Sequence, residues 1–202
     1  NCLVANVNAG KAHNADTAAG DDSNIQIESI GDLPVGLVTA GVGNVALTST
    51  GDIDSVVDNN VADVRGSQID LSAAVGGIGN NRTLDVAAAT VLNADTEAGD
   101  DGDIQIDSIG DLPVGLVSAG TGDVTLDSTG DIDSFATNGV ADITADEIRL
   151  LAAVGGIGND AILEVMALTA LSADTDAGEN SNAQRTSIGD MPLGLVEAGK
   201  GN

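Results

Sequence analysis

The sequence is most informative in the residues that it lacks. Its 202 residues include no tryptophan, no tyrosine and one phenylalanine, Phe135. Globular cores usually gain much of their buried area from aromatic side chains, so a core of that kind is not expected. The apolar residues make up 42% of the chain and are nearly all Val, Ile, Leu and Ala. Such side chains suit a narrow interior that keeps the same shape at every level.

Basic residues are also rare. The chain has 6 Lys and Arg residues against 32 Asp and Glu, which gives a formal net charge of −26. Nucleic-acid binding needs cationic side chains against phosphates, so a nucleic-acid partner is disfavoured, as is an anionic membrane surface. No stretch approaches the length of a transmembrane helix, and membrane insertion is not expected. A strongly acidic surface stays soluble and tolerates salt, which fits an extracellular or cell-surface location.

Residues for catalysis are also few. The one cysteine, Cys2, allows no disulfide within the chain and is interpreted as a free thiol. The one histidine, His13, lies in the least regular part of the sequence, where nothing places it against a nucleophile. The acidic residues recur along the chain, which is typical of turn formers and not of one tuned acid–base pair. We therefore predict no catalytic residues, no cofactor-binding residues and no enzymatic activity.

What the sequence does contain is a repeat. Residues 29–38 return unchanged as 108–117 and, slightly altered, as 187–196. The two offsets are equal (108 − 29 = 79 and 187 − 108 = 79), and a fixed period of this kind marks a repeat architecture. The predicted units of one continuous solenoid are a partial repeat 1–13, full repeats 14–92 and 93–171, and a partial repeat 172–202.

Short apolar–polar–apolar segments recur inside each repeat, with the period of a half-buried strand. They begin at Ile25, Val45, Ile69, Leu84 and Ile104, so the steps are 45 − 25 = 20, 69 − 45 = 24, 84 − 69 = 15 and 104 − 84 = 20. Each segment is followed by small residues and a turn of Gly, Asp or Asn. Four strand–turn units per repeat predict an all-β solenoid with about four coils in each repeat. The rival fold is a series of tandem β-sandwich domains, although these typically bury a large aromatic residue.

Residues 29–41, 43–53 and 69–79 resemble the repeats of filamentous-haemagglutinin-type exoproteins, which are very large bacterial surface adhesins. The resemblance covers nearly the whole chain and consists of pattern and composition. It implies that the solenoid is a right-handed parallel β-helix. It also implies a structural role, as a shaft module of a large secreted adhesin or extracellular filament.

The ends of such a solenoid carry unpaired backbone N–H and C=O groups, which invite pairing with another strand. Both ends of this chain lie within a repeat and carry no recognisable cap. The expected partners are neighbouring repeats of a longer chain or further copies stacked end to end.

Turns rich in aspartate are the best candidates for metal ligands, because clustered carboxylates suit Ca²⁺. The two groups are Asp16, Asp21 and Asp22, and Asp95, Asp100, Asp101 and Asp103. The EF-hand spacing is missing, and the third repeat has Glu179 and Asn180 in these places. The acids are therefore interpreted first as turn formers, and no residue is predicted to be a metal ligand. An extracellular Ca²⁺- or ligand-binding repeat module is the alternative function.

Arg185 departs from the repeat. It stands where the second repeat has Ile106, and Ala183 stands where that repeat has Ile104. An arginine in an inward column is costly unless it is paired or lies at an end. The exchange indicates a cap, a local distortion or a partner site, and the sequence leaves these three open.

Two motif-like runs are interpreted as structural or accidental. Residues 76–79 and 155–158 read Gly-Gly-Ile-Gly, without the spacing and the following helix of a phosphate loop, so they are interpreted as corner glycines. Residues 81–83 form a glycosylation-type sequon that the counterpart at Asp160 loses, and we interpret it as chance.

Overall fold

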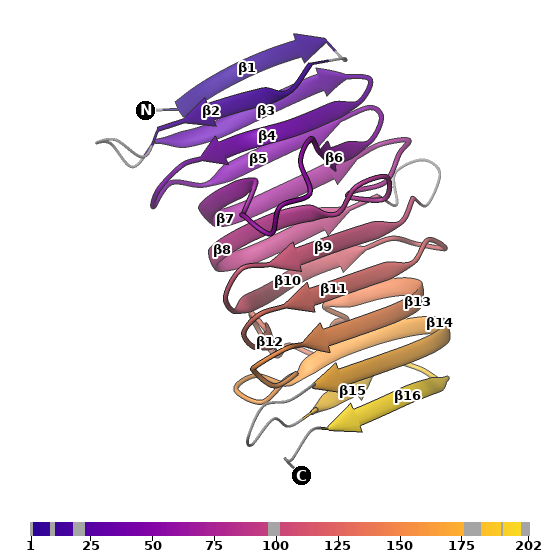
Figure 1. The fold of residues 1–202 in the computed structure, drawn as a ribbon. Coiled ribbons are helices and arrows are strands. Elements are labelled where there is room, and N and C mark those ends of the chain that lie inside the picture. Colours follow the sequence, from indigo (N-terminus) through magenta and orange to yellow (C-terminus); the bar gives the residue numbers. More distant parts are fainter. Residues whose placement is uncertain are drawn as a thin grey trace.

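The computed structural model describes residues 2–8, 11–17, 23–96, 102–175, 183–190 and 192–198. These residues form sixteen β-strands and no helix (Figure 1). Every pairing among these strands is parallel, and the strands wind into a solenoid of about eight turns that matches a right-handed parallel β-helix. The predicted fold class is confirmed. Tandem β-sandwiches are excluded, because they are built from antiparallel sheets.

In chain order the strands are β1 (Cys2–Asn8), β2 (His13–Asp16), β3 (Asn24–Ile30), β4 (Leu33–Thr39), β5 (Val45–Ser49), β6 (Ile53–Ser55), β7 (Val64–Ala73), β8 (Leu84–Asp95), β9 (Ile104–Ser108), β10 (Leu112–Ser118), β11 (Val124–Ser128), β12 (Ile132–Ser134), β13 (Ile143–Ala152), β14 (Leu163–Thr175), β15 (Arg185–Ser187) and β16 (Leu193–Ala198).

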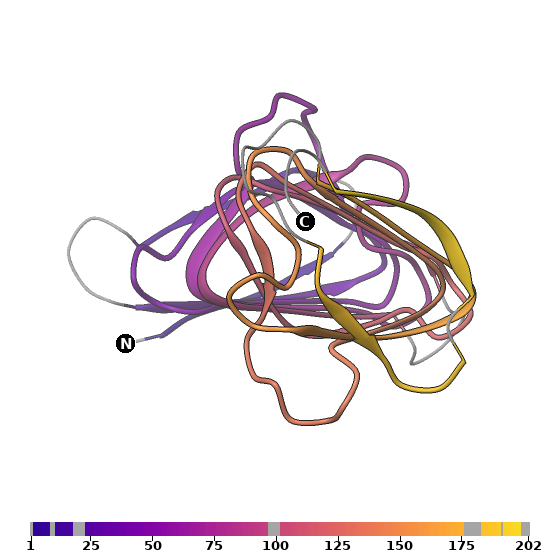
Figure 2. The same cartoon turned by 90° about the horizontal axis from the view of Figure 1, so that it is seen from below.

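Each turn crosses two faces of the coil, as the view along its axis shows (Figure 2). Face 1 consists of β1, β3, β5, the second halves of β7 and β8, β10, β12, the first halves of β13 and β14, and β15. Face 2 consists of β2, β4, β6, the first halves of β7 and β8, β9, β11, the second halves of β13 and β14, and β16. The long strands β7, β8, β13 and β14 therefore bend from one face onto the other.

The turns are longer than the sequence pattern predicted. On face 1 the successive partners are Ile25, Val45, Ile69, Leu92 and Val114, so the last two turns measure 92 − 69 = 23 and 114 − 92 = 22 positions. The predicted short step from Ile69 to Leu84 is not a turn, because Leu84 lies on face 2, where its partner is Ile106. That segment crosses from one face to the other.

One repeat therefore spans about three and a half turns, compared with the predicted count of about four. The face 2 partners Leu33, Ile53, Ile78 and Ile104 complete three turns. The remaining part of the repeat, 25–32, supplies the half turn from face 1 to face 2. Equivalent strands of consecutive repeats consequently lie on opposite faces, as β3 and β9 do. The loops 56–63 and 135–142, which are equivalent, project from opposite sides of the coil (Figure 2).

The core is a set of inward aliphatic columns. The largest fully buried side chains are all Ile or Leu, and Val and Ala fill the remaining inward positions. One column on face 2 runs through Leu84, Ile106, Leu126 and Leu150, each 0–1% exposed. Full burial of one such side chain stabilises a fold by about 1.5–3 kcal/mol. The single aromatic residue, Phe135, lies outside the core and is 55% exposed.

The last glycine of each Gly-Gly-Ile-Gly run has a structural role. Gly79 and Gly158 have φ of 68° and 65°, a left-handed conformation that favours glycine. A side chain at either residue would also collide with the backbone oxygen of the next turn, at Gln105 and Gln184 respectively. These glycines let successive turns approach closely, as expected of corner residues.

The columns generate the first prediction. Ile104→Asp or Leu126→Asp places a carboxylate in the interior, and we expect each to lower the free energy of unfolding by at least about 3 kcal/mol. Thr125→Ser, one residue before Leu126 on the outward side of the strand, is the matched control, and its expected change is within about 1 kcal/mol. Urea unfolding followed by circular dichroism measures all three. Equal tolerance of the three substitutions would contradict the inward columns.

Candidate metal centre

The aspartate-rich turns, which are the alternative candidates for a Ca²⁺ site, are only partly described. The residues outside the described part of the chain are Asp21, Asp22, Asp100, Asp101, Glu179 and Asn180. Asp16 ends β2, Asp95 ends β8, and Asp103 directly precedes β9. Asp103 Oδ1 accepts the N–H of Asp123 at 2.9 Å, so this carboxylate links two successive coils and does not close its own turn. Ca²⁺ binding at these turns stays the alternative hypothesis.

A different group of carboxylates comes together in the second repeat. Asp131, Asp133 and Asp160 each have an oxygen within 4.8 Å of one from both of the others. Asp131 directly precedes β12 and Asp133 lies in it, while Asp160 follows the bridge residue Ile157 one turn later. The solenoid therefore brings Asp160 to two residues that lie a full turn earlier in the chain. We call these three residues the acidic triad.

Backbone groups of the next turn orient two members of the acidic triad. Asp131 Oδ1 accepts the N–H of Gly156 at 2.6 Å, and Asp133 Oδ1 accepts the N–H of Asp160 at 3.2 Å. Burial raises the pKa of Asp133; hydrogen bonds from the Asp160 and Ala161 backbone oppose the rise, and the nearby charges of Asp131 and Asp160 add to it. A cation between the three carboxylates would relieve this repulsion.

The acidic triad also lines a pocket. The pocket has a volume of about 460 Å³ and is bordered by Asp111, Pro113 and Ala88 of β8 as well as by the triad. Carboxylate oxygens in an open, hydrated recess are the ligands of Ca²⁺, which takes 6–8 oxygens and completes its shell with water.

The first repeat holds the equivalent group in a neutralised form. Asp52 and Asp54 correspond to Asp131 and Asp133 by the fixed offset of the repeats, and Asn81 corresponds to Asp160. Asn81 Nδ2 donates to Asp52 Oδ2 at 3.0 Å and to Asp54 Oδ2 at 2.9 Å. An amide donor therefore stands between the two carboxylates of repeat 1, whereas repeat 2 has a third carboxylate. The sequence signal for this difference was the loss of the sequon at Asp160, which we had interpreted as chance.

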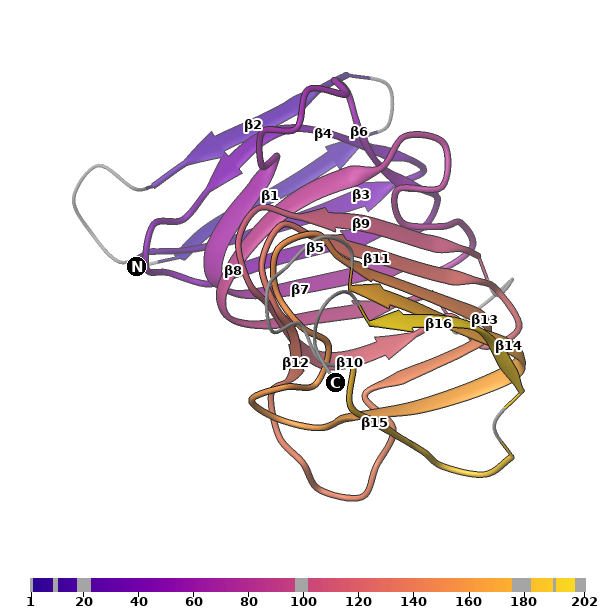
Figure 3. The same cartoon turned by 60° about the horizontal axis from the view of Figure 1, so that its bottom comes forward.

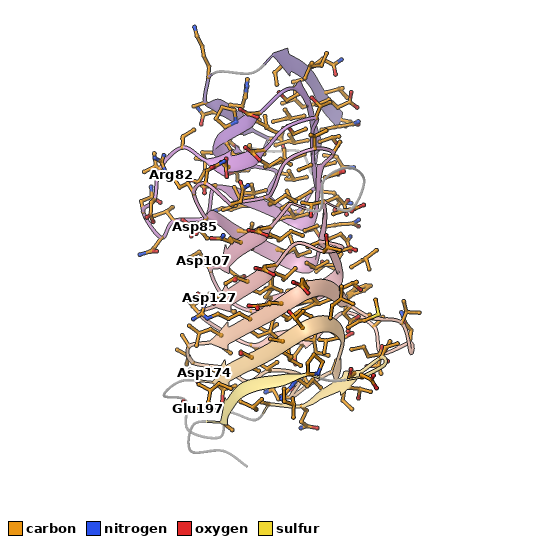
Figure 4. All side chains as sticks on the ribbon, turned by 90° about the vertical axis from the view of Figure 1, so that its right-hand side faces the viewer. Arg82, Asp85, Asp107, Asp127, Asp174 and Glu197 are labelled. Atoms are coloured by element: carbon orange, nitrogen blue, oxygen red, sulfur yellow. The ribbon has the colours of Figure 1, made fainter. Side chains whose placement is uncertain are left out.

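A ladder of carboxylates points outward along face 2, and its first member, Asp85, is buried beneath loop 56–63 (Figure 4). Asp85, Asp107 and Asp127 are register partners in three successive turns. The same outward column continues through Leu151 to Asp174 and Glu197. Adjacent parallel strands lie about 4.8 Å apart, so the carboxylates repel one another.

Asp107 is the member of the ladder whose pKa is raised most. Burial raises the pKa of Asp107 to about 6, and the charges of Asp127, Asp85 and Asp58 add to the rise, while Arg149 opposes it. Arg149 Nη1 lies 3.2 Å from Asp127 Oδ1 and forms an exposed ion pair with it.

Two buried carboxylates, Glu164 and Asp142, fix the conformation of loop 135–142 in the second repeat through hydrogen bonds. Glu164 accepts the backbone N–H of Asn138 at 3.0 Å and of Gly139 at 2.8 Å. The N–H of Glu164 donates to Asp142 Oδ2 at 2.8 Å, and burial raises the pKa of Asp142. The equivalent pair in the first repeat is Asp85 and Asp63, whose pKa values are also raised by burial.

Arg185 follows Leu163 on the inward side of face 1, as the sequence predicted. Burial lowers the pKa of its guanidinium, and its Nε has no hydrogen-bond partner among the described residues. It borders a pocket of about 370 Å³ with Ala183 and Leu193. The unpartnered Nε and the lowered pKa agree with the expected cost of an arginine in an inward column.

The two residues considered for reactivity lie at the first turns. His13 is the first residue of β2, opposite Val35, and its Nε2 has no hydrogen-bond partner in the described part of the chain. Cys2 is an exposed free thiol in β1. Neither touches the acidic triad, which belongs to the second repeat.

The ladder generates a prediction for the pH dependence of stability. Because the pKa of Asp107 is higher in the folded chain than its ordinary value of 3.8, folding favours the protonated form. Its stabilising contribution is complete below about pH 4 and is lost as the pH rises through about 6. Lowering the pH from about 7.5 to about 5 should therefore stabilise the chain, by about 1–2 kcal/mol after allowance for screening.

Thermal unfolding of Asp107→Asn tests the assignment. The substitution should raise the melting temperature at neutral pH and reduce the gain on acidification, while the buried carboxylates Asp133 and Asp142, whose pKa values are also raised, keep the rest of that gain. Glu147→Gln, at an exposed carboxylate, is the control and should keep that gain. An unchanged pH profile in Asp107→Asn would show that the ladder is not its source.

No family model, no curated protein and no solved structure matches the chain. The resemblance to filamentous-haemagglutinin-type repeats thus stays a prediction from the sequence pattern. Among the described residues there is also no helix long and apolar enough to cross a membrane.

Proposed function

We propose that this chain is a structural shaft module of a large secreted surface adhesin or extracellular filament. The observation that carries the proposal is the continuity of the strand ladder across the repeat boundary. Val86 of the first repeat pairs with Ser108 of the second, and Leu92 pairs with Val114. Separate domains would interrupt these ladders, whereas a shaft transmits load through an unbroken series of backbone pairs.

The surface supports the same role. A net charge of −26 discourages side-to-side clumping of parallel rods, and the polar outer columns remain hydrated. The extracellular location and the resemblance to adhesin repeats belong to this proposal and rest on composition and pattern.

The proposed partners are neighbouring repeats of a longer chain or further copies of this one. β1 begins face 1 and β15 is the last described strand of that face, while β2 and β16 hold the same places on face 2. A second copy placed head to tail would thus continue both faces in parallel. Leu193 and Leu195 of β16 are 60% and 62% exposed and would be covered in such a stack.

Sedimentation and negative-stain microscopy of the isolated chain test the shaft proposal. We expect unbranched rods whose length grows with protein concentration, and more so in high salt because salt screens the acidic surface. A stable, monodisperse monomer at high concentration in both salts would contradict end-to-end pairing.

The acidic triad favours a second candidate function, the binding of Ca²⁺ by the second repeat. Three carboxylates without an amide donor between them distinguish this group from its counterpart in repeat 1. An affinity on the order of 10⁻⁴ M is typical of extracellular modules with few protein ligands.

The two repeats supply matched variants for titration calorimetry with Ca²⁺ and EDTA. The unmodified chain should bind one ion at the triad and melt at a higher temperature in Ca²⁺. Asp160→Asn copies repeat 1 into repeat 2 and should abolish this binding. Asn81→Asp copies repeat 2 into repeat 1 and should add a site. No heat and no change in melting temperature in the unmodified chain would eliminate this function.

A further inference from the structure

The loop 135–142, between β12 and β13, contains the only Asn-Gly pair of the sequence, Asn138-Gly139. The loop projects away from the rod (Figure 3). Both residues are exposed to water. We propose that Asn138 is a self-modification site, at which the chain converts the asparagine through a succinimide into aspartate or isoaspartate.

Gly139 provides the nucleophile, its backbone nitrogen, and Glu164 is placed as the base. Glu164 Oε1 accepts the N–H of Gly139 at 2.8 Å and Oε2 lies 3.1 Å from the same nitrogen. A general base must lie within hydrogen-bond reach of the proton that it removes, and this contact meets that condition. Gly139 has no Cβ to obstruct ring closure, and no atom lies within 4 Å of the place where a Cβ would stand.

Val140 is placed to stabilise the charge that develops during the attack. Its backbone N–H donates to Asn138 Oδ1 at 2.8 Å. A donor at this distance polarises the side-chain carbonyl and stabilises the oxygen as it becomes anionic. The electrophile, the nucleophile and the oxyanion donor thus come from three consecutive loop residues, and the base comes from one buried strand residue. Such fixed proximity is a large source of rate enhancement.

The reaction balances with water as the only co-reactant. The Gly139 nitrogen gives its proton to Glu164 and forms a bond to Asn138 Cγ. The bond from Cγ to Nδ2 then breaks, and the leaving amide nitrogen takes up the proton and departs as ammonia. Water opens the resulting succinimide at either carbonyl, which gives aspartate or isoaspartate without any change of oxidation state.

The first repeat provides an internal control. Asn59 has the same donor contact, with the N–H of Val61 3.0 Å from its Oδ1. The next residue is Asn60, at φ 53°, so the nucleophile carries a side chain. The carboxylate that holds this loop is the shorter Asp85. Asn59 should therefore persist under conditions in which Asn138 is converted.

Conversion would change the loop itself. It adds a carboxylate next to the buried pair Glu164 and Asp142, or inserts an extra backbone carbon where isoaspartate forms. Either product weakens the hydrogen bonds from the loop to Glu164, so the modification would mark older copies of the chain. This inference goes beyond the shaft and Ca²⁺ proposals and depends on neither.

Peptide mapping by mass spectrometry, after incubation of the whole chain in ¹⁸O-labelled water, measures the conversion at both asparagines. We expect Asn138 to incorporate label at least about tenfold faster than Asn59. The rate at Asn138 should be higher in the native chain than in urea, where the contacts with Glu164 and Val140 are lost. Glu164→Gln, which keeps an acceptor of the same shape, should slow it about tenfold or more.

An unaided Asn-Gly pair would give the opposite pattern, because the unfolded chain reaches the attack geometry more freely. A native rate equal to or below the rate in urea would overturn the proposal. An undiminished rate in a folded Glu164→Gln variant would overturn it as well. The comparison with urea needs no variant, so it decides the matter even where the substitution impairs folding.

Discussion

Every feature of this molecule depends on the stacking of small aliphatic side chains in register, turn upon turn. A parallel ladder places equivalent inward positions about 4.8 Å apart, so each column must be filled by residues that pack on copies of themselves. Ile, Leu, Val and Ala satisfy this condition, and the columns are fully buried from Ile25 to Leu171. The absence of tryptophan and tyrosine follows, since a large ring would need space that the neighbouring turns do not provide.

The turn length decides where function can reside. Because a repeat covers about three and a half turns, its copies alternate between the two faces, and each loop of one repeat reappears on the opposite side in the next. A rod of such repeats would present the same group on one face only at every second repeat. The core tolerates this alternation because both faces carry the same aliphatic columns. Outward residues are under no such constraint, and there the two full repeats differ, as Asn81 and Asp160 do.

The fold could be predicted well because two patterns, the alternation within strands and the fixed offset between repeats, are visible in the residues themselves. Alternation with period two located β3, β5, β7, β8 and β9, and the fixed offset showed that they belong to one repeated unit. The number of turns was less accessible, because the pattern identifies strands but not the face on which each lies. Residues 79–83 separate Ile78 from β8, and only the pairing register shows that Leu84 lies on the same face as Ile78, face 2.

The candidate site was harder to predict than the fold. Asp131 and Asp133 recur in repeat 1 as Asp52 and Asp54, so they were indistinguishable from turn formers. They lie close to Asp160 only because the solenoid returns to the same place after one turn, and the length of that turn cannot be read from the sequence. The same holds for Glu164 and Gly139, which lie a full turn apart along the chain and in contact in space.

Disulfide cross-linking of register partners tests the half-turn arrangement most directly. Asp70 and Asn93 are partners on face 1, with Asn93 Nδ2 2.7 Å from Asp70 Oδ1. In a Cys2→Ser background, Asp70→Cys with Asn93→Cys should oxidise readily to a disulfide, because neighbouring strands meet its geometric requirement. Asp70→Cys with Asp85→Cys should not, since Asp85 lies on face 2. A disulfide in the second pair and none in the first would mean that Leu84 begins a new turn, and would contradict three and a half turns per repeat.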